Sequence, residues 1–190
     1  MSFFGRLRTW ATGLRRGGKR HLGTLALFAG VLLAVQIWQT RGVAGGPLPD
    51  AALDAPLPVL AGGSVRPSTL RAEIAALQAA HPGRNIGLYV WADWCPICRT
   101  IQGTVNSLTE DHPVITIAMQ SGQPEKVART LAARGLAWHT LVDPRSAIPG
   151  ALGFGAVPAF AVITPEGALR WPTVGLTSGW GLRLRLLFAG

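Results

Sequence analysis

The chain has 190 residues, of which 48% are apolar and 14% are charged, with 18 lysines and arginines against 9 acidic residues. This length excludes two large domains, and the apolar content excludes a disordered chain. Seven basic residues and no acidic residue lie in residues 1–49, which leaves eleven basic and nine acidic residues in 50–190. Because the excess charge is confined to the N-terminal part, the formal net charge of +9 does not require a nucleic-acid partner.

An uncharged run covers residues 22–38. As a helix it is about 26 Å long, slightly shorter than the ~30 Å hydrocarbon core of a bilayer. Trp38 at its end and the flanking Arg20 and Arg41 are residue types that sit at membrane interfaces. We therefore predict a single transmembrane anchor over 22–38, in contact with membrane lipid.

The distribution of positive charge around this run predicts its orientation. Six basic residues precede the run and one follows it, so the positive-inside rule places residues 1–21 in the cytoplasm as a basic tail. The rest of the chain is then exported across the membrane. A cleaved signal peptide is the alternative, because residues 42–44 (Gly-Val-Ala) are small enough for a cleavage site.

The exported part is predicted to contain one α/β domain. Residues 39–55 are rich in Gly, Pro and Ala without periodicity and are expected to form a flexible linker, and 56–190 the domain. The order of elements indicates a mixed sheet covered by helices on both faces. The expected elements are a helix at Leu70–Leu77, a strand at Ile86–Trp91, a helix bearing Ile97, Ile101, Val105 and Leu108, a strand at Val114–Ala118, a helix from Pro124 to Gly135, a turn-rich stretch from Leu141, strands at Phe160–Ile163 and Leu169–Val174 around a tight turn, and a last helix from about Ser178.

The two cysteines of the chain, Cys95 and Cys98, lie where the first of these strands gives way to a helix. If Cys95 is the N-cap and Pro96 the first helical residue, the Cys95 sulfur meets the free amides and the positive end of the helix, which lowers the pKa of its thiol. Cys98 follows one helical turn later on the same face and can resolve a mixed disulfide on Cys95. The pattern predicts a nucleophile, Cys95, and a resolving thiol, Cys98.

A cysteine pair can also form part of a zinc site, a copper(I) site or a structural disulfide. A structural zinc site needs four ligands, and the chain has no second cysteine pair and no paired histidines. A copper(I) site with two thiolates is chemically allowed, although no Met or His lies beside the pair. A purely structural disulfide would close a loop of only four residues and constrain the unfolded chain little. Copper binding and an inert disulfide remain the competing interpretations, and no metal ligand is assigned.

The sequence resembles the thioredoxin superfamily, in particular membrane-anchored bacterial proteins of the TlpA, ResA and cytochrome c maturation group and of the suppressor-of-copper-sensitivity operons. The segment 91–98 (WADWCPIC) is similar to the family's W-A-x-W-C-x-x-C, and 152–158 (LGFGAVP) looks like the approach to the family's cis-proline. The resemblance covers about residues 56–190 and includes the single N-terminal anchor. It implies a thioredoxin-like fold, an anchor in contact with the lipid of a bacterial inner membrane, and a domain in the periplasm.

The resemblance also implies roles for residues around the cysteines. Val157 and Pro158 match the cis-proline loop, which pairs with bound substrate, and Trp94 matches a residue that shapes the docking surface. Pro96 and Ile97, between the cysteines, are expected to contact substrate as well. The redox-active Cys95–Cys98 disulfide is expected to serve without a further cofactor.

Two family features are absent. Thioredoxins carry a buried Asp where this chain has Tyr89, and cytochrome c maturation relatives carry a Glu where it has Ile101. The sequence nevertheless predicts a membrane-tethered periplasmic thiol–disulfide oxidoreductase that exchanges disulfides with protein substrates, in the reducing rather than the oxidising direction. Its electrons would come from a membrane partner of the thiol-reductase type. A copper(I)-binding or metallochaperone module is the alternative function.

Overall fold

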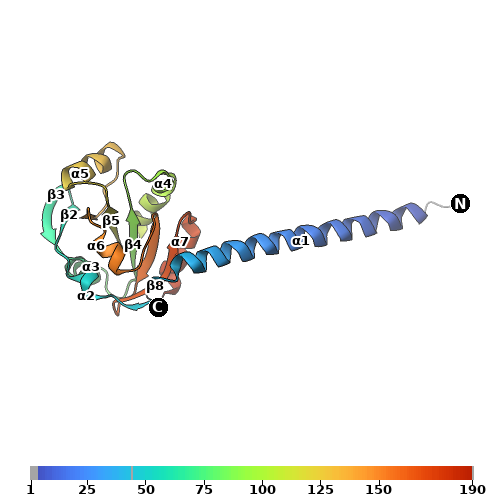
Figure 1. The fold of residues 1–190 in the computed structure, drawn as a ribbon, viewed down its shortest axis with the longest axis horizontal. Helices are drawn as coiled ribbons and strands as arrows, with labels where there is room; N and C mark the ends of the chain where they lie inside the picture. The colour runs from blue at the N-terminus through green and yellow to red at the C-terminus, as the bar shows by residue number, and fades with distance from the viewer. Residues whose placement is uncertain (1–3, 44, 190) are drawn as a thin grey trace. The chain divides into compact units, whose positions relative to one another are not determined.

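The computed structural model describes residues 4–43 and 45–189, and the side chains of residue 21, residues 23–43 and residues 45–189 (Figure 1). The chain divides into two compact units, which meet between Trp38 and Gln39. Helix α1 (Phe4–Thr40) makes up the described part of the first unit and extends two residues into the second. Its segment Gly23–Thr40 is long and apolar enough to cross a membrane by length and composition, a test that a signal sequence also passes. The predicted anchor over 22–38 lies within α1.

The second unit is built on one sheet whose strands follow the order β1-β8-β7-β4-β5-β6-β2-β3. The central strands β4 and β5 are parallel, as are β5 and β6, whereas the other neighbours pair antiparallel. All side chains of β4 and β5 are buried, as expected for strands covered on both faces. The strands are β1 (Gly46–Pro47), β2 (Leu57–Ala61), β3 (Ser64–Ser68), β4 (Ile86–Trp91), β5 (Val114–Met119), β6 (Thr140–Asp143), β7 (Ala159–Ile163) and β8 (Ala168–Val174).

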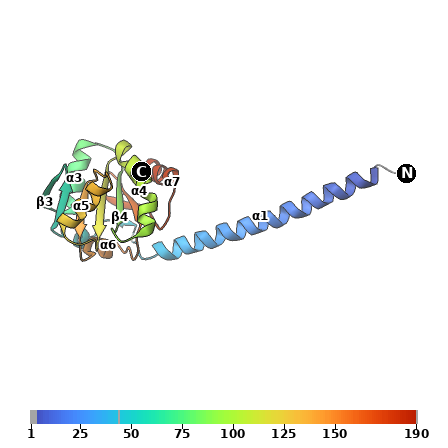
Figure 2. The same ribbon diagram turned by 90° about the horizontal axis from the view of Figure 1, so that it is seen from above.

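Helices cover both faces of this sheet (Figures 1 and 2). One apolar core lies between the sheet and α2 (Asp50–Leu53), α3 (Leu70–Ala80) and α6 (Ala147–Ala151). The other core lies between the sheet and α4 (Pro96–Asp111), α5 (Pro124–Ala133) and α7 (Gly179–Phe188), and it contains both cysteines. The predicted α/β class, with a mixed sheet flanked by helices, is confirmed.

Three segments differ from the sequence-based expectation. The hairpin β2–β3 was not predicted, because β3 is exposed along its length and its sequence, SVRPS, lacks the alternation of a half-buried strand. Leu141 and Val142, which were expected to begin a turn-rich stretch, belong to β6, whose four residues are all buried. Leu141–Val142 was too short a run to be identified as a strand from periodicity.

The predicted flexible linker, 39–55, is the third difference. Val43, Leu48 and Ala52 are buried in the first core, β1 pairs with β8, and α2 is attached to α3 by Arg71, which binds Asp50 and Asp54 at 2.7 and 2.6 Å. Few apolar side chains anchor this segment, and they are spaced without a helical or strand period. Composition alone therefore does not reveal the packing of this segment. Residues 39–55 belong to the folded unit.

A substitution at Gly153 tests the packing of residues 42–43 against the rest of the folded unit. Gly153 has a φ of +82°, and a Cβ at this position would overlap the backbone carbonyl of Gly42. Gly153→Ala should lower the free energy of unfolding by about 1–3 kcal/mol, because it adds both left-handed backbone strain and a steric clash. Denaturant unfolding monitored by tryptophan fluorescence measures this. The matched control is Gly155→Ala, where a Cβ meets no atom within 4 Å; equal stability of the two variants would contradict the packing of residues 42–43.

A buried carboxylate fastens the β2–β3 hairpin to the rest of the sheet. Glu73 on α3 is 1% exposed and lies 2.7 Å from the Arg66 guanidinium of β3 and 2.7 Å from the His139 imidazole. Burial raises the pKa of Glu73, but hydrogen bonds from Arg66 and Ser68 and the charges of His139 and Arg66 outweigh it, so the pKa falls below its usual value. The ionised form therefore stabilises the fold.

The lowered pKa of Glu73 sets the sign of a pH effect. Its contribution is fully present above the ordinary pKa of 4.5 and is lost as the pH falls through the folded-state pKa. Glu73→Gln should cost about 1–3 kcal/mol of unfolding free energy at pH 7, because charge-assisted hydrogen bonds are lost. The difference from the parent chain should shrink below about pH 4.5. A difference that stays constant from neutral to acidic pH, in urea titrations, would contradict this account.

Candidate redox site

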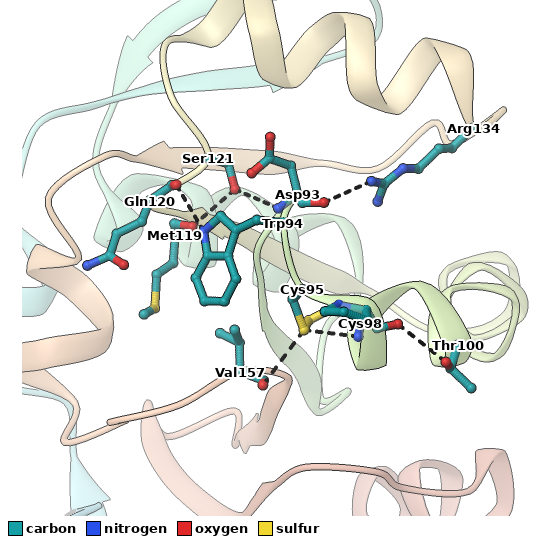
Figure 3. Close-up of a disulfide and its surroundings, with 11 residues drawn as sticks. Asp93, Trp94, Cys95, Cys98, Thr100, Met119, Gln120, Ser121, Arg134 and Val157 are labelled. Atoms are coloured by element: carbon teal, nitrogen blue, oxygen red, sulfur yellow. Dashed lines mark hydrogen bonds between the residues drawn. A yellow bond between two sulfur atoms is a disulfide. The ribbon is translucent and has the colours of Figure 1, made fainter.

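The cysteines lie at the carboxyl end of β4, where the chain turns into α4. Cys95 is the N-cap of α4, and its Sγ accepts a hydrogen bond from the Cys98 backbone N–H at 3.0 Å. The two cysteines form a disulfide with their Cα atoms 5.3 Å apart (Figure 3). The Cys95 sulfur therefore lies among free backbone amides at the positive end of a helix, where a thiolate is stabilised after reduction.

The local sequence explains why α4 begins here. Pro96 is the first residue of the helix, where a missing N–H has no cost and its fixed φ suits the helical conformation. Beyond it, Ile101, Val105 and Leu108 are buried at helical spacing against the sheet. This apolar face holds α4 against β4, so the position of Cys95 is set by the core beneath it.

The surface around the pair is apolar. Both cysteines are only 3% exposed, whereas Trp94 is 54% and Ile97 is 47% exposed, and Pro96 is exposed as well. Two large apolar side chains thus lie at the surface beside sulfurs that are nearly covered. Exposed apolar side chains of this kind are a feature of binding surfaces.

The loop before β7 approaches the same sulfur. The Val157–Pro158 peptide bond is cis, as the resemblance implied. The carbonyl oxygen of Val157 lies 3.8 Å from Cys95 Sγ, close enough to accept a hydrogen bond from a reduced thiol (Figure 3). The structure therefore brings together Cys95, Cys98 and Val157 from segments 62 residues apart in sequence.

A network that the sequence did not reveal holds the residues preceding Cys95. The Asp93 backbone N–H donates to Ser121 Oγ at 2.9 Å, and Trp94 Nε1 donates to the Gln120 carbonyl at 3.2 Å. Residues 120 and 121 directly follow β5. Because β4 and β5 are parallel, their carboxyl ends meet at one edge of the sheet. That topology, rather than any motif, is the signal that could have identified them.

Helix α5 and the residue that caps its end contribute two cations to this network. Lys126 Nζ lies 2.6 Å from the Asp93 carboxylate. The Arg134 guanidinium donates to the Asp93 carbonyl at 3.1 Å (Figure 3). Asp93 is thus held through its backbone N–H, its carbonyl and its carboxylate. The segment between β4 and Cys95 is a fixed support for Trp94 and the N-cap.

The position that holds a buried Asp in thioredoxins has no carboxylate here. Tyr89 is 1% exposed in the core that contains the cysteines, and its ring packs edge-on against Trp138 with centroids 5.7 Å apart. Burial raises the pKa of Tyr89 well above its ordinary value. Its phenol therefore stays protonated and is not a base at neutral pH. Ile101 is buried in the same core, as its apolar side chain requires.

Among the residues that the structure describes there is no group of three or more His, Cys, Asp or Glu side chains that could hold a metal ion. His112, the C-cap of α4, lies in a separate surface cavity with Glu110 and Asp111 of the last turn of that helix.

Comparisons with known proteins agree with this geometry. No protein-family model matches the chain. A thioredoxin-like protein of Haemophilus influenzae is 30% identical over 115 residues, which cover 60% of this chain and 68% of that protein. Among solved structures, Mycobacterium tuberculosis DsbF superposes with a TM-score of 0.58 at 20% identity, over 72% of this chain and 96% of that one. The exposed lipoprotein thioredoxin Etrx1 of Streptococcus pneumoniae gives a TM-score of 0.52 at 20% identity, over 70% and 98%.

The two kinds of similarity carry different weight. The solved structures share the fold at low identity, whereas the Haemophilus protein shares sequence over two thirds of its length. The chain itself places a cysteine pair at the amino end of a helix in that fold. The chain belongs to the thioredoxin-like family of protein-disulfide oxidoreductases.

Proposed function

We propose that this protein is a membrane-tethered periplasmic oxidoreductase that reduces disulfides in protein substrates. One observation carries the proposal: the Cys95 sulfur caps α4 while bonded to Cys98, beside the exposed apolar side chains of Trp94 and Ile97. A helix N-terminus favours a thiolate, and the apolar surface can bind a polypeptide around a disulfide.

The chemistry follows from these positions. In the reduced protein, the Cys95 thiolate attacks a substrate disulfide, forms a mixed disulfide and releases one substrate thiolate, which takes up a proton. The Cys98 sulfur then attacks Cys95 Sγ, and the second substrate thiolate leaves. The product is the Cys95–Cys98 disulfide that the structure contains. Two electrons and two protons from a thiol donor restore the dithiol, and we assign that donor to a membrane protein of the thiol-reductase type.

Two groups around the pair support roles in substrate binding. The Val157 carbonyl, 3.8 Å from Cys95 Sγ, lies where an extended substrate segment would pass the sulfur, with Pro158 directly behind it. Trp94, Pro96 and Ile97 are exposed next to the same sulfur. Together these residues provide apolar contact area and one backbone acceptor, which suits proteins of varied sequence better than a single small ligand.

The location rests on the N-terminal part of the chain. Gly23–Thr40 is suited to span a membrane, and the excess of basic residues before it favours a cytoplasmic N-terminus. The folded unit would then lie in the periplasm. The pneumococcal neighbour is described as an exposed lipoprotein, which is a different attachment to the same side of a membrane.

The surroundings of Cys95 favour the reducing direction. A strong oxidant of this family has a stabilised reduced form. Here the hydrogen bond described for Cys95 Sγ comes from the Cys98 amide, and the side chains of Pro96 and Ile97 provide neither a hydrogen-bond donor nor a charge. The thiolate is therefore only modestly stabilised, which lowers the potential relative to an oxidant.

The division of labour between the cysteines is tested by Cys98→Ser. This variant keeps the backbone N–H that stabilises the Cys95 thiolate but removes the resolving thiol, so mixed disulfides should accumulate on Cys95. Incubation of the full chain with a disulfide-containing protein such as insulin, followed by non-reducing electrophoresis and mass spectrometry, detects them. The matched control is Cys95→Ser, which should trap several-fold less. Equal trapping by both variants, or none by Cys98→Ser, would refute the mechanism.

The direction of electron flow is tested by the reduction potential. Equilibration of the full chain in detergent with glutathione buffers should give a value below about −200 mV, toward the thioredoxin end of the family's range. Ile97→His adds an imidazole beside Cys95 at a half-exposed position, so the fold is retained. It should raise the potential by roughly 30 mV or more, because a cation stabilises the thiolate of the reduced form. A parent value near about −120 mV would identify an oxidant instead.

A further inference from the structure

The last helix, α7, exposes apolar side chains on the face that points away from the core. Trp180 is 78%, Leu187 65% and Phe188 68% exposed, and Leu184 is 49% exposed. Leu182 and Leu186 on the other face are buried against the sheet. The structure therefore leaves an apolar face of α7 uncovered, a feature that marks interaction surfaces.

The geometry of α7 gives this face a defined shape. With about 100° between successive residues, Trp180, Leu184, Leu187 and Phe188 fall within one arc of about 100°. Arg183 and Arg185 lie on either side of that arc. An apolar stripe flanked by arginines is the arrangement of helices that lie in the plane of a membrane interface, with the arginine stems extending toward headgroups.

Strand β8 extends the stripe by one residue. The pairing of β7 with β8 is irregular, since Phe160 pairs with Thr173 but Val162 with Arg170, which leaves an extra residue on β8. Trp171 lies in this bulge with a φ of +50°, an uncommon conformation for a bulky residue, and is 56% exposed. Its indole N–H donates to the Phe188 carbonyl at the end of α7, at 3.3 Å. The bulge therefore directs an exposed tryptophan to the stripe. We call Trp171, Trp180, Leu184, Leu187 and Phe188 the α7 surface.

The charge near the α7 surface favours an anionic partner. Residues 167–189 contain three arginines, at positions 170, 183 and 185, and no acidic residue. Arg183 binds Asp111 at 2.9 Å, so one of these charges is compensated. The two exposed tryptophans, Trp171 and Trp180, also favour a membrane surface, because tryptophan side chains prefer the boundary between hydrocarbon and headgroups.

Chain length places a membrane within reach. The helix suited to cross a bilayer ends at Thr40, and Val43 is the first buried residue of the folded unit. Three Cα–Cα steps span at most about 11 Å. If Gly23–Thr40 crosses the bilayer, as the proposed function holds, the folded unit cannot leave the bilayer surface, and a face of that unit lies against lipid headgroups.

We propose that the α7 surface is a second, peripheral membrane contact, which lies in the headgroup region of an anionic bilayer. This inference rests on the tether of the proposed function and extends it from a point of attachment to an orientation. Helix α4 packs directly against α7, through the bonds from Arg183 to Ser107 and Asp111. Contact of α7 with the membrane would therefore hold the folded unit in one orientation, in which α4, with Cys95 at its amino end, stays close to the bilayer.

Site-specific photocrosslinking tests this contact. The full chain carrying p-benzoylphenylalanine in place of Leu187 is reconstituted into vesicles of phosphatidylethanolamine and phosphatidylglycerol, illuminated, and analysed for lipid adducts by mass spectrometry. The matched control carries the same group in place of Arg129, an exposed residue of α5. Lipid adducts should be several-fold more abundant at position 187. Equal yields at the two positions, or crosslinks at 187 to a second copy of the chain, would overturn the proposal.

A double variant separates this contact from the tether and from the redox chemistry. Leu184→Glu with Leu187→Glu alters two side chains outside the core and should lower lipid adducts from p-benzoylphenylalanine at position 180 several-fold, because carboxylates are repelled by anionic headgroups. Insulin reduction in detergent should be unchanged. An unchanged adduct yield would overturn the α7 contact alone. Release of the parent chain from vesicles by carbonate washing would contradict the tether and, with it, this inference.

Discussion

The site depends on the parallel pairing of β4 and β5 in a sheet covered on both faces. Buried parallel strands end together at one edge, and at that edge β4 leads into Cys95 while β5 leads into Gln120 and Ser121. The apolar face of α4 then fixes the helix whose first amides surround the sulfur. The redox site is therefore positioned by the apolar burial beneath it.

Much of this could be predicted from the sequence, because the relevant signals are local. The run Ile86–Trp91, the proline after Cys95 and the apolar residues at helical spacing define strand, N-cap and helix, and the structure contains all three. The spacing of the two cysteines is also a local signal, and it predicted thiol–disulfide exchange. Where the signal was weak, as in the exposed strand β3 or in the four residues of β6, the expectation was incomplete.

The parts that could not be predicted depend on contacts between distant residues. Lys126 and Arg134 reach Asp93 only because α5 packs on the same face as α4, and no spacing in the sequence relates them. Composition predicts a flexible linker over 39–55, yet three isolated apolar side chains, Val43, Leu48 and Ala52, attach this segment to the core. Val157 lies 62 residues from Cys95 in the sequence, so no local pattern relates the two. Only the family resemblance predicted that Val157 lies at the site.

The replacement of a buried carboxylate by Tyr89 has consequences for the second half of the reaction. In the reducing direction the Cys98 thiol must lose its proton before it attacks the mixed disulfide, and burial in an apolar core opposes that loss. A phenol whose pKa is raised by burial cannot accept the proton near neutrality. The Cys98 proton must therefore pass to another acceptor, such as water or the substrate thiolate released in the first step. Because Cys98 is only 3% exposed in the disulfide form, that acceptor reaches the thiol only if the residues that cover the sulfur move apart.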